Sequence, residues 1–187
     1  KNKLKGVSGI LIPGGFGKRG TEGKIAAITY ARKNNIPFLG ICFGMQMAVI
    51  EFARNKLNIK KATSSEFGPS KASVVGLMSE WVKDGKKIKG TDKDLGGTMR
   101  LGSYEAKLKK GSLISNIYNS TKINERHRHR YEVNINFKEE FEKNGMIFSG
   151  LSPDSKLPEI IELKKITEEL GINLIYKTSF DKANRTS

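Results

Sequence analysis

Apolar runs alternate with amphipathic stretches at the start of the chain. Residues 7–13 (VSGILIP) are rich in branched side chains and end at a glycine-rich turn, which predicts a buried strand that runs into a loop. Residues 36–42 (IPFLGIC) predict a second strand. Apolar or small residues at helical spacing predict helices in residues 25–35 and 43–57. A strand, helix, strand and helix in this order predict a parallel sheet covered by helices, and therefore the α/β class.

The rest of the chain carries shorter and less regular patterns. Residues 62–101 are irregular and contain Gly and Asp, which predicts loops and short antiparallel strands, as do residues 130–134 (RYEVN) and 146–153 (MIFSGLSP). Near the end, KKITEEL predicts a helix over residues 164–170, and INLIYKTSF predicts a strand over residues 172–180. The sequence contains no internal repeat.

Length and cysteine content limit the class of protein. A chain of 187 residues is long enough for one domain with a substantial core. No apolar run approaches the roughly 18 to 20 residues that cross a bilayer, and the first residues lack the apolar core of a signal peptide. One cysteine cannot form an internal disulfide, so Cys42 suits a reducing compartment. We therefore expect a soluble, cytoplasmic protein without a membrane partner.

The net charge raises nucleic-acid binding as an alternative. The chain has 34 Lys and Arg against 19 Asp and Glu, a net charge of +15. However, the lysines are spread along the whole length, and only residues 126–130 (RHRHR) form a dense cluster. Spread charge is more typical of a solvated surface than of a binding face, so nucleic acid is not the expected partner.

The candidate nucleophile is Cys42, at the junction of a predicted strand and a predicted helix. Its flanking sequence, GICFG, is the thiol version of a nucleophile elbow, whose sharp turn leaves little room for side chains at Gly40 and Gly44. The amides at the start of the helix favour the thiolate, and the amide after Cys42 can donate to a developing oxyanion. The alternative, a small buried hydrophobe, is the commoner role of a lone cysteine. The flanking glycines argue against it.

A glycine-rich loop, residues 13–17 (PGGFG), follows the first predicted strand. Lys18 and Arg19 come next, and loops of this kind often bind phosphate. The sequence lacks both the GxxxxGK[ST] spacing and GxGxxG. Because two parallel strands bring their following loops to the same edge of a sheet, we expect Gly15 to present a second oxyanion donor opposite Cys42.

These motifs together resemble those of a known family. PGGFG and GICFGMQ are similar to the PGG loop and the GxCxGxQ elbow of class I glutamine amidotransferases. SSEF, GTMRLG, ERHRHRYEVN and EIIEL, in this order, resemble the glutaminase domain of the CTP synthase family over about residues 4–163. The resemblance implies a three-layer, flavodoxin-like α/β fold with a mostly parallel sheet, here truncated at both ends.

A glutamine site is also implied by the resemblance. The residues that would hold glutamine are Gly15, Phe43, Gly44, Met45, Gln46, Glu66 and Arg130. Glutamine is a zwitterion, so the carboxylate of Glu66 suits its ammonium group and the guanidinium of Arg130 suits its carboxylate. In this family the thiolate attacks the side-chain amide, ammonia leaves, and a glutamyl thioester is hydrolysed.

The same resemblance implies partners beyond this chain. In the family, a synthetase domain uses the ammonia to aminate UTP to CTP with ATP. The whole enzyme also uses Mg²⁺, takes GTP as an activator and forms homotetramers. We expect the synthetase domain to be absent here, and we expect this chain to hold no cofactor and no metal.

The catalytic base of the family has no counterpart at the matching place in this sequence. Thiol catalysis needs a base, usually a histidine oriented by a carboxylate, and the family carries both in a His-Pro-Glu triplet soon after EIIEL. This chain has two histidines, His127 and His129, and both lie upstream in the segment that matches the glutamine site. They could be metal ligands or a base, but we expect a structural or surface role. We therefore predict slow or absent glutamine hydrolysis.

Residues 164–187 resemble a different family. FDKANR and the strand before it are similar to 3-deoxy-D-manno-octulosonate 8-phosphate synthase, a TIM-barrel enzyme. The positions that would match its phosphate- and substrate-binding residues are Lys177, Lys182, Asn184 and Arg185. We therefore divide the chain into a partial amidotransferase domain, residues 1–163, and an unrelated tail from a fused enzyme fragment. A further hypothesis places the strand of this tail in the sheet, where the family's histidine-bearing strand would lie.

The sequence leaves more than one function open. The first is the glutaminase part of a CTP synthase, weak or inactive for want of the base. The alternative is a non-catalytic, degenerate amidotransferase module that binds glutamine or a partner, or a basic nucleic-acid-binding protein. Glutamine binding without turnover would favour the module, and salt-dependent retention on a polyanion would favour nucleic-acid binding.

Overall fold

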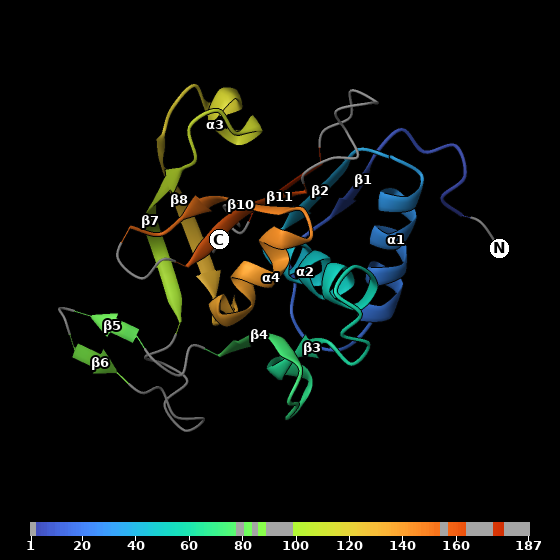
Figure 1. Ribbon diagram of the computed structural model, residues 1–187, viewed down its shortest axis with the longest axis horizontal. Coiled ribbons are helices and arrows are strands. Elements are labelled where there is room, and N and C mark those ends of the chain that lie inside the picture. The colour runs from blue at the N-terminus through green and yellow to red at the C-terminus, as the bar shows by residue number, and fades with distance from the viewer. Residues whose placement is uncertain are drawn as a thin grey trace, which may run out of the picture.

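The structure is a computed structural model in which helices pack on one large sheet (Figure 1). It describes residues 3–77, 81–83, 86–88, 99–153, 157–163 and 174–177. Within these ranges, no helix is long and apolar enough to cross a membrane. The predicted α/β class is confirmed.

The first elements follow the predicted order. They are β1 (Ile10–Ile12), α1 (Thr21–Lys33), β2 (Phe38–Ile41) and α2 (Phe43–Asn55). β1 and β2 pair in parallel, with Ile12 opposite Gly40. Because both strands run in the same direction, the loops that follow them leave from the same edge of the sheet. The first helix begins at Thr21, one turn before the predicted start.

The large sheet has seven strands in the order β1-β2-β12-β11-β10-β7-β8. The strands not yet introduced are β7 (Arg100–Leu108), β8 (Lys122–His129), β10 (Met146–Leu151), β11 (Pro158–Leu163) and β12 (Leu174–Lys177). Pairing is parallel from β1 through β2 to β12 and antiparallel from β12 to β8. The sheet is therefore mixed, which corrects the expectation of a mostly parallel one. A short connection, residues 152–157, joins β10 to β11, and a connection of this length reverses the strand direction.

Shorter elements surround this sheet. They are β3 (Thr63–Ser64), β4 (Ser73–Leu77), β5 (Trp81–Lys83), β6 (Lys86–Ile88), β9 (Tyr131–Val133), α3 (Leu113–Tyr118) and α4 (Lys138–Lys143). β3, β4 and β9 form one small sheet, and β5 and β6 form another. The short strands predicted in the irregular middle are confirmed, although β3 and β4 pair in parallel and not antiparallel.

The main core lies between the sheet and the helices. Every residue of α2 from Phe43 to Ala53 is buried. The apolar side chains among them join one cluster with residues from α1, β2, β4, β10 and α4. In the view of Figure 1, α2 lies between α4 and α1. A helix that is covered on all sides is held firmly, so the residue at its start has a fixed position.

β12 lies inside the sheet, between β2 and β11. It pairs in parallel with β2, with Lys177 opposite Ile41, and antiparallel with β11. The hypothesis that the tail contributes a strand to the sheet is confirmed for these 4 residues. The C-terminal end of β12 therefore lies beside the end of β2 that leads to Cys42. The helix predicted over residues 164–170, and also Lys182, Asn184 and Arg185, lie outside the described residues.

Candidate active site

Cys42 occupies the sharp turn between β2 and α2. Its backbone angles are φ 53° and ψ −106°, which belong to neither a helix nor a strand. Its carbonyl accepts hydrogen bonds from the amides of Met45 and Gln46, at 3.0 and 3.2 Å, and so begins the helix. The amides of Phe43 and Gly44 fall in the first turn, where a helix offers no internal acceptor. The half-buried thiol thus lies at the N-terminus of a rigid helix, as predicted.

Two close backbone approaches explain the glycines of the elbow. A Cβ atom on Gly40 would lie 2.8 Å from the carbonyl oxygen of Gly44. A Cβ atom on Gly44 would clash with the carbonyl oxygen of Ile12 in β1. Backbone atoms cannot move away as a flexible side chain could, so neither position accepts a side chain. This agrees with the reason given for glycine from the sequence.

The loop after β1 lies against the elbow. A Cβ atom on Gly15 would lie 3.8 Å from Cδ1 of Phe43, so Gly15 is next to the residue that follows Cys42. The parallel register of β1 and β2 places both loops at the same edge. The loop and the amide of Phe43 therefore lie at the same edge of the sheet, where the sequence predicts a pair of oxyanion donors.

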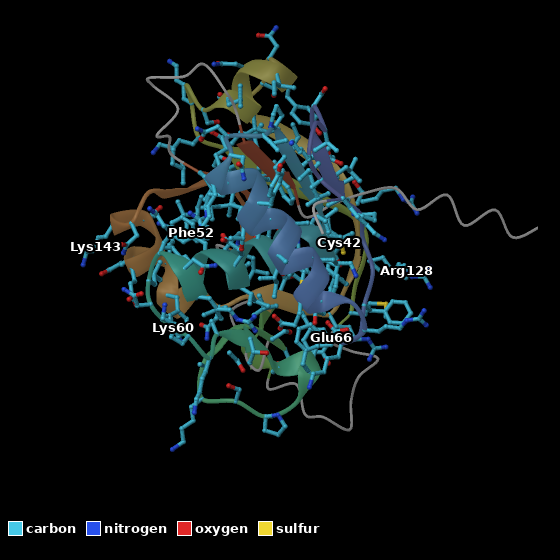
Figure 2. All side chains as sticks on the ribbon, turned by 90° about the vertical axis from the view of Figure 1, so that its right-hand side faces the viewer. Cys42, Phe52, Lys60, Glu66, Arg128 and Lys143 are labelled. Atoms are coloured by element: carbon cyan, nitrogen blue, oxygen red, sulfur yellow. The ribbon has the colours of Figure 1, made fainter. Side chains whose placement is uncertain are left out.

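Glu66 reaches the same region from a short 3₁₀ turn. Its Oε1 atom accepts a hydrogen bond from the amide of Gly17 at 2.5 Å. The ring of the next residue, Phe67, packs edge-on against Phe43, with centroids 6.2 Å apart. These two contacts hold the carboxylate beside the glycine-rich loop. Figure 2 shows Glu66 and Cys42 on the same half of the molecule.

Gln46 connects the elbow helix to β9. Its side chain is buried, and its Nε2 atom donates a hydrogen bond to the carbonyl of Tyr131 at 2.8 Å. Since Tyr131 directly follows Arg130, this contact brings Arg130 toward the first turns of α2. Arg130 is half-buried, and no carboxylate of the described residues pairs with its guanidinium. Within the part of the chain that the structure describes, the Arg130 guanidinium is therefore without a carboxylate partner near the elbow.

Some predicted binding residues do not offer a side chain. Phe43 and Met45 are each 1% exposed and lie in the main core, so only their backbone groups could face a ligand. The same holds for Gly15 and Gly44, which have none. The structure places the Gln46 side chain against the Tyr131 carbonyl, the Glu66 carboxylate against the glycine-rich loop, and Arg130 directly before Tyr131 in the chain.

The two histidines belong to a buried ionic cluster on β8. His127 and His129 are 3% and 9% exposed, whereas their arginine neighbours on the same strand face outward. His127 Nδ1 lies 2.8 Å from His129 Nε2, and His127 Nε2 lies 3.2 Å from a carboxylate oxygen of Glu159. His129 Nδ1 lies 3.2 Å from the carbonyl oxygen of Tyr131. All four ring nitrogens thus have partners, which fits a structural role and excludes a surface one.

Arg100 on β7 is the cation of this cluster. Its guanidinium lies 3.2 Å from Glu132 and 2.7 Å from Glu159, and all three side chains are buried. Burial raises the pKa of Glu159, and it raises the pKa of Glu132 to about 7, although Arg100 acts in the opposite direction. Burial also lowers the pKa of His129 to about 4, and the nearby Arg100 adds to this effect. The cluster therefore favours the neutral form of His129 and disfavours the ionised forms of Glu132 and Glu159.

This cluster was not foreseen from the sequence. The available signal was a charged residue inside an otherwise apolar strand, such as Glu159 in LPEIIEL. The partners of Glu159 could not be named, because Arg100 lies 59 residues away in the chain.

Comparisons with known proteins agree with this geometry. The family model described as Glutamine amidotransferase class-I matches residues 1–168. A CTP synthase from Pelagibacter ubique is 73% identical over 172 residues, which cover 92% of this chain and 32% of that protein. A CTP synthase from Zymomonas mobilis is 61% identical over 160 residues, which cover 85% of this chain and 29% of that protein. The chain thus spans about a third of the length of these curated relatives.

Solved structures give the same result. The glutaminase domain of Trypanosoma brucei CTPS with bound acivicin aligns with a TM-score of 0.77 and 36% identity, covering 94% of this chain and 63% of that chain. A glutamine amidotransferase from Thermotoga maritima has a TM-score of 0.56 at 12% identity, covering 95% of this chain and 57% of that chain, and supports the fold alone. The chain therefore belongs to the class I glutamine amidotransferase family.

Proposed function

We propose that this chain is the glutaminase part of a CTP synthase and that its own glutamine hydrolysis is slow or absent. The observation that carries the proposal is the thiol of Cys42 at an elbow whose Gly44 packs against β1, with the Gly15 loop beside it. The high identity to CTP synthases supports this choice among amidotransferases. In the complete enzyme, ammonia released here would pass to a synthetase domain that aminates UTP to CTP.

Two charged side chains support glutamine as the substrate. The carboxylate of Glu66 has one oxygen engaged by Gly17, which leaves the other for the ammonium group of glutamine. The guanidinium of Arg130 suits the α-carboxylate, because its planar fork can donate two parallel hydrogen bonds. Charges of opposite sign at the two ends of the site would select the zwitterion and orient its side-chain amide toward Cys42.

The reaction begins with attack of the Cys42 thiolate on the side-chain amide carbon of glutamine. The carbonyl π electrons move to oxygen, where backbone N–H groups of Phe43 and of the Gly15 loop would stabilise the oxyanion. Collapse of this intermediate breaks the C–N bond, and the nitrogen takes one proton as it leaves as ammonia. Water then hydrolyses the glutamyl thioester, which gives glutamate and restores the thiol. Formation of the thioester and its hydrolysis therefore each need a group that transfers a proton.

The described residues provide no free histidine for these proton transfers. Both ring nitrogens of His127 and of His129 are engaged within the buried cluster, and the chain has no other histidine. Loss of one member of a nucleophile–base pair commonly lowers kcat by several orders of magnitude, on the order of 10⁴ or more. We therefore propose a site that binds glutamine and reacts slowly.

The other ligands of the CTP synthase reaction belong with the synthetase domain in this proposal. Among the described residues, no group of three His, Cys, Asp or Glu side chains could hold a metal ion. We assign ATP and Mg²⁺ to the partner domain, as the resemblance to the CTP synthase family implies. GTP activation and a homotetrameric assembly would likewise be properties of the whole enzyme.

Labelling of Cys42 by a glutamine-mimicking diazo ketone or chloroketone tests the proposal. We expect labelling of one thiol, slowed by added L-glutamine and not by D-glutamine, at a rate far below that of a complete CTP synthase at neutral pH. Released ammonia, measured over the same period, should stay near the background of the Cys42→Ala variant.

Each departure from this result has a separate meaning. Labelling as fast as in a complete enzyme would contradict the missing base. Labelling that L-glutamine does not slow would contradict the glutamine site. Saturable L-glutamine binding with no turnover at all would favour a non-catalytic binding module over a slow enzyme.

A further inference from the structure

Arg130 is the single residue between β8 and β9, and both of its neighbours are fixed. The carbonyl oxygen of Tyr131 accepts a hydrogen bond from Gln46 of α2 at 2.8 Å, and it lies 3.2 Å from His129 Nδ1. The preceding residue, His129, is itself buried in the ionic cluster. The Tyr131 carbonyl, just after Arg130, is thus held by the side chains of Gln46 and His129. The residue just before Arg130 is held by its burial.

Hydrogen positions on the two histidines follow from their partners. A carbonyl oxygen only accepts, so His129 Nδ1 carries the hydrogen that is donated to Tyr131, and Glu132 lies 3.4 Å from the same nitrogen. His129 is neutral because its pKa is lowered to about 4, so its Nε2 atom is an acceptor. His127 Nδ1, at 2.8 Å, must then be the donor to it. The bonds run in one direction, from His127 through His129 to Tyr131.

At the His127 end, this series of hydrogen bonds meets the charged groups of the cluster. His127 Nε2 lies 3.2 Å from Glu159, so one proton is shared between this nitrogen and the carboxyl oxygen. Arg100 contributes one positive charge, and Glu132 and Glu159 can contribute two negative charges. When both carboxylates are ionised, the shared proton makes the buried cluster neutral overall. A neutral, fully bonded cluster is stable in a low-dielectric interior, and it fixes the ring of His129 in one orientation.

We propose that His129 is a positioning residue for glutamine: together with Gln46 it fixes the Tyr131 carbonyl, and so holds Arg130 where it can bind the α-carboxylate. The proposal rests on the proposed function, since it takes Arg130 as the carboxylate anchor. His129 does not touch the substrate. It acts on binding by restricting the backbone of the residue that does.

Two substitutions separate positioning from packing. His129→Leu fills a similar volume but removes the donor to Tyr131. His129→Asn keeps an N–H group near the position of Nδ1, so it should rescue what His129→Leu loses. Arg32→Met is the matched control, because it breaks the 2.7 Å ion pair between half-buried Arg32 of α1 and buried Glu51 of α2 without removing a contact of Tyr131. It should destabilise the fold without affecting Arg130.

Binding of two ligands gives the first measurement. L-Glutamine carries the α-carboxylate, whereas 4-aminobutanamide is the same molecule without it. We expect His129→Leu to weaken L-glutamine binding roughly 10- to 100-fold, the effect of a lost or misplaced charged hydrogen bond, and to leave 4-aminobutanamide unchanged. His129→Asn should restore L-glutamine binding to near the unsubstituted value.

The ligand-free protein gives the second measurement. ¹⁵N relaxation of the Arg130 backbone amide should show greater mobility in His129→Leu than in His129→Asn, Arg32→Met or the unsubstituted chain. Unchanged mobility in His129→Leu would overturn the proposal, whether or not glutamine binds. Greater mobility of the Arg130 amide together with equally weakened binding of L-glutamine and 4-aminobutanamide would overturn the link between His129 and the α-carboxylate. If the unsubstituted chain binds no glutamine, the proposed function fails, and the relaxation data still decide whether His129 positions Arg130.

Discussion

At the scale of single residues, the elbow forces Cys42 into a backbone conformation that L-residues avoid. Its φ of 53° with ψ of −106° brings Cβ close to the backbone, and such conformations cost on the order of 1–3 kcal/mol. The surrounding packing enforces the turn, because the amides of α2, the Gly44–Ile12 contact and β2 leave no room for another path. The strain presents the thiol at the rim of the sheet instead of burying it.

A pair of substitutions measures this strain. Both Cys42→Gly and Cys42→Ala remove the thiol, but only glycine relieves the crowding at positive φ. We therefore expect Cys42→Gly to be more stable than Cys42→Ala by about 1 kcal/mol, measured by urea unfolding. At most other positions alanine is the more stabilising of the two, so Gly23→Ala in α1, where a Cβ would meet no atom within 4 Å, should stabilise the chain. A Cys42→Ala variant more stable than Cys42→Gly would show that the elbow is unstrained.

At the scale of elements, the ionic cluster joins β7, β8, β9 and β11 through groups with opposite pH responses. Glu132 has its pKa raised from 4.5 to about 7 by burial, so the folded chain keeps this proton after the unfolded chain has lost it. This contribution to stability is therefore lost as the pH rises through that window. The pKa of His129 is lowered from 6.5 to about 4, so the unfolded chain takes up this proton first, and stability is lost as the pH falls through that window.

The two contributions can be separated by substitution. The unfolding free energy of the unsubstituted chain minus that of His129→Asn should increase as the pH rises from 4 to 6.5, by up to roughly 1 kcal/mol for each pH unit. The unfolding free energy of the unsubstituted chain minus that of Glu132→Gln should decrease as the pH rises from 4.5 to 7. Urea unfolding across this pH range measures both. Equal slopes for the two variants would contradict the assigned protonation states.

The sequence predicts an element well when neighbouring residues determine it, and poorly when residues far away in the chain determine it. β1, α1, β2 and α2 follow from runs of neighbouring residues, and the glycines around Cys42 mark a turn whose crowding is also local. The antiparallel half of the sheet depends on which strands meet, which periodicity does not encode. The cluster around Arg100 depends on partners up to 59 residues away, and the burial of His129 follows from those partners. The sequence motif could locate the histidines but not their surroundings.

At the scale of the whole molecule, β12 determines what stands next to the nucleophile. It pairs with β2 up to Lys177 opposite Ile41, so both strands end at the edge where Cys42 lies. The C-terminal end of a parallel strand in this position lies at the same edge of the sheet as the elbow. In the family that the chain resembles, a histidine and a glutamate follow the strand expected here. The fold therefore provides a place for the base, while the sequence of this chain does not provide the base.

Exchange of the segment after Leu163 for a segment that carries the family's His-Pro-Glu triplet tests this argument. If the sheet and the elbow are already competent, adding the family's His-Pro-Glu triplet should raise the rate of ammonia release from glutamine by roughly 10³-fold or more. The same exchange in a Cys42→Ala chain is the control and should stay at background. A second control exchanges the segment but replaces the introduced histidine by alanine, which keeps the strand and removes the base. An exchange that folds, binds glutamine and still fails to release ammonia would mean that the defect lies in the elbow and not in the missing base.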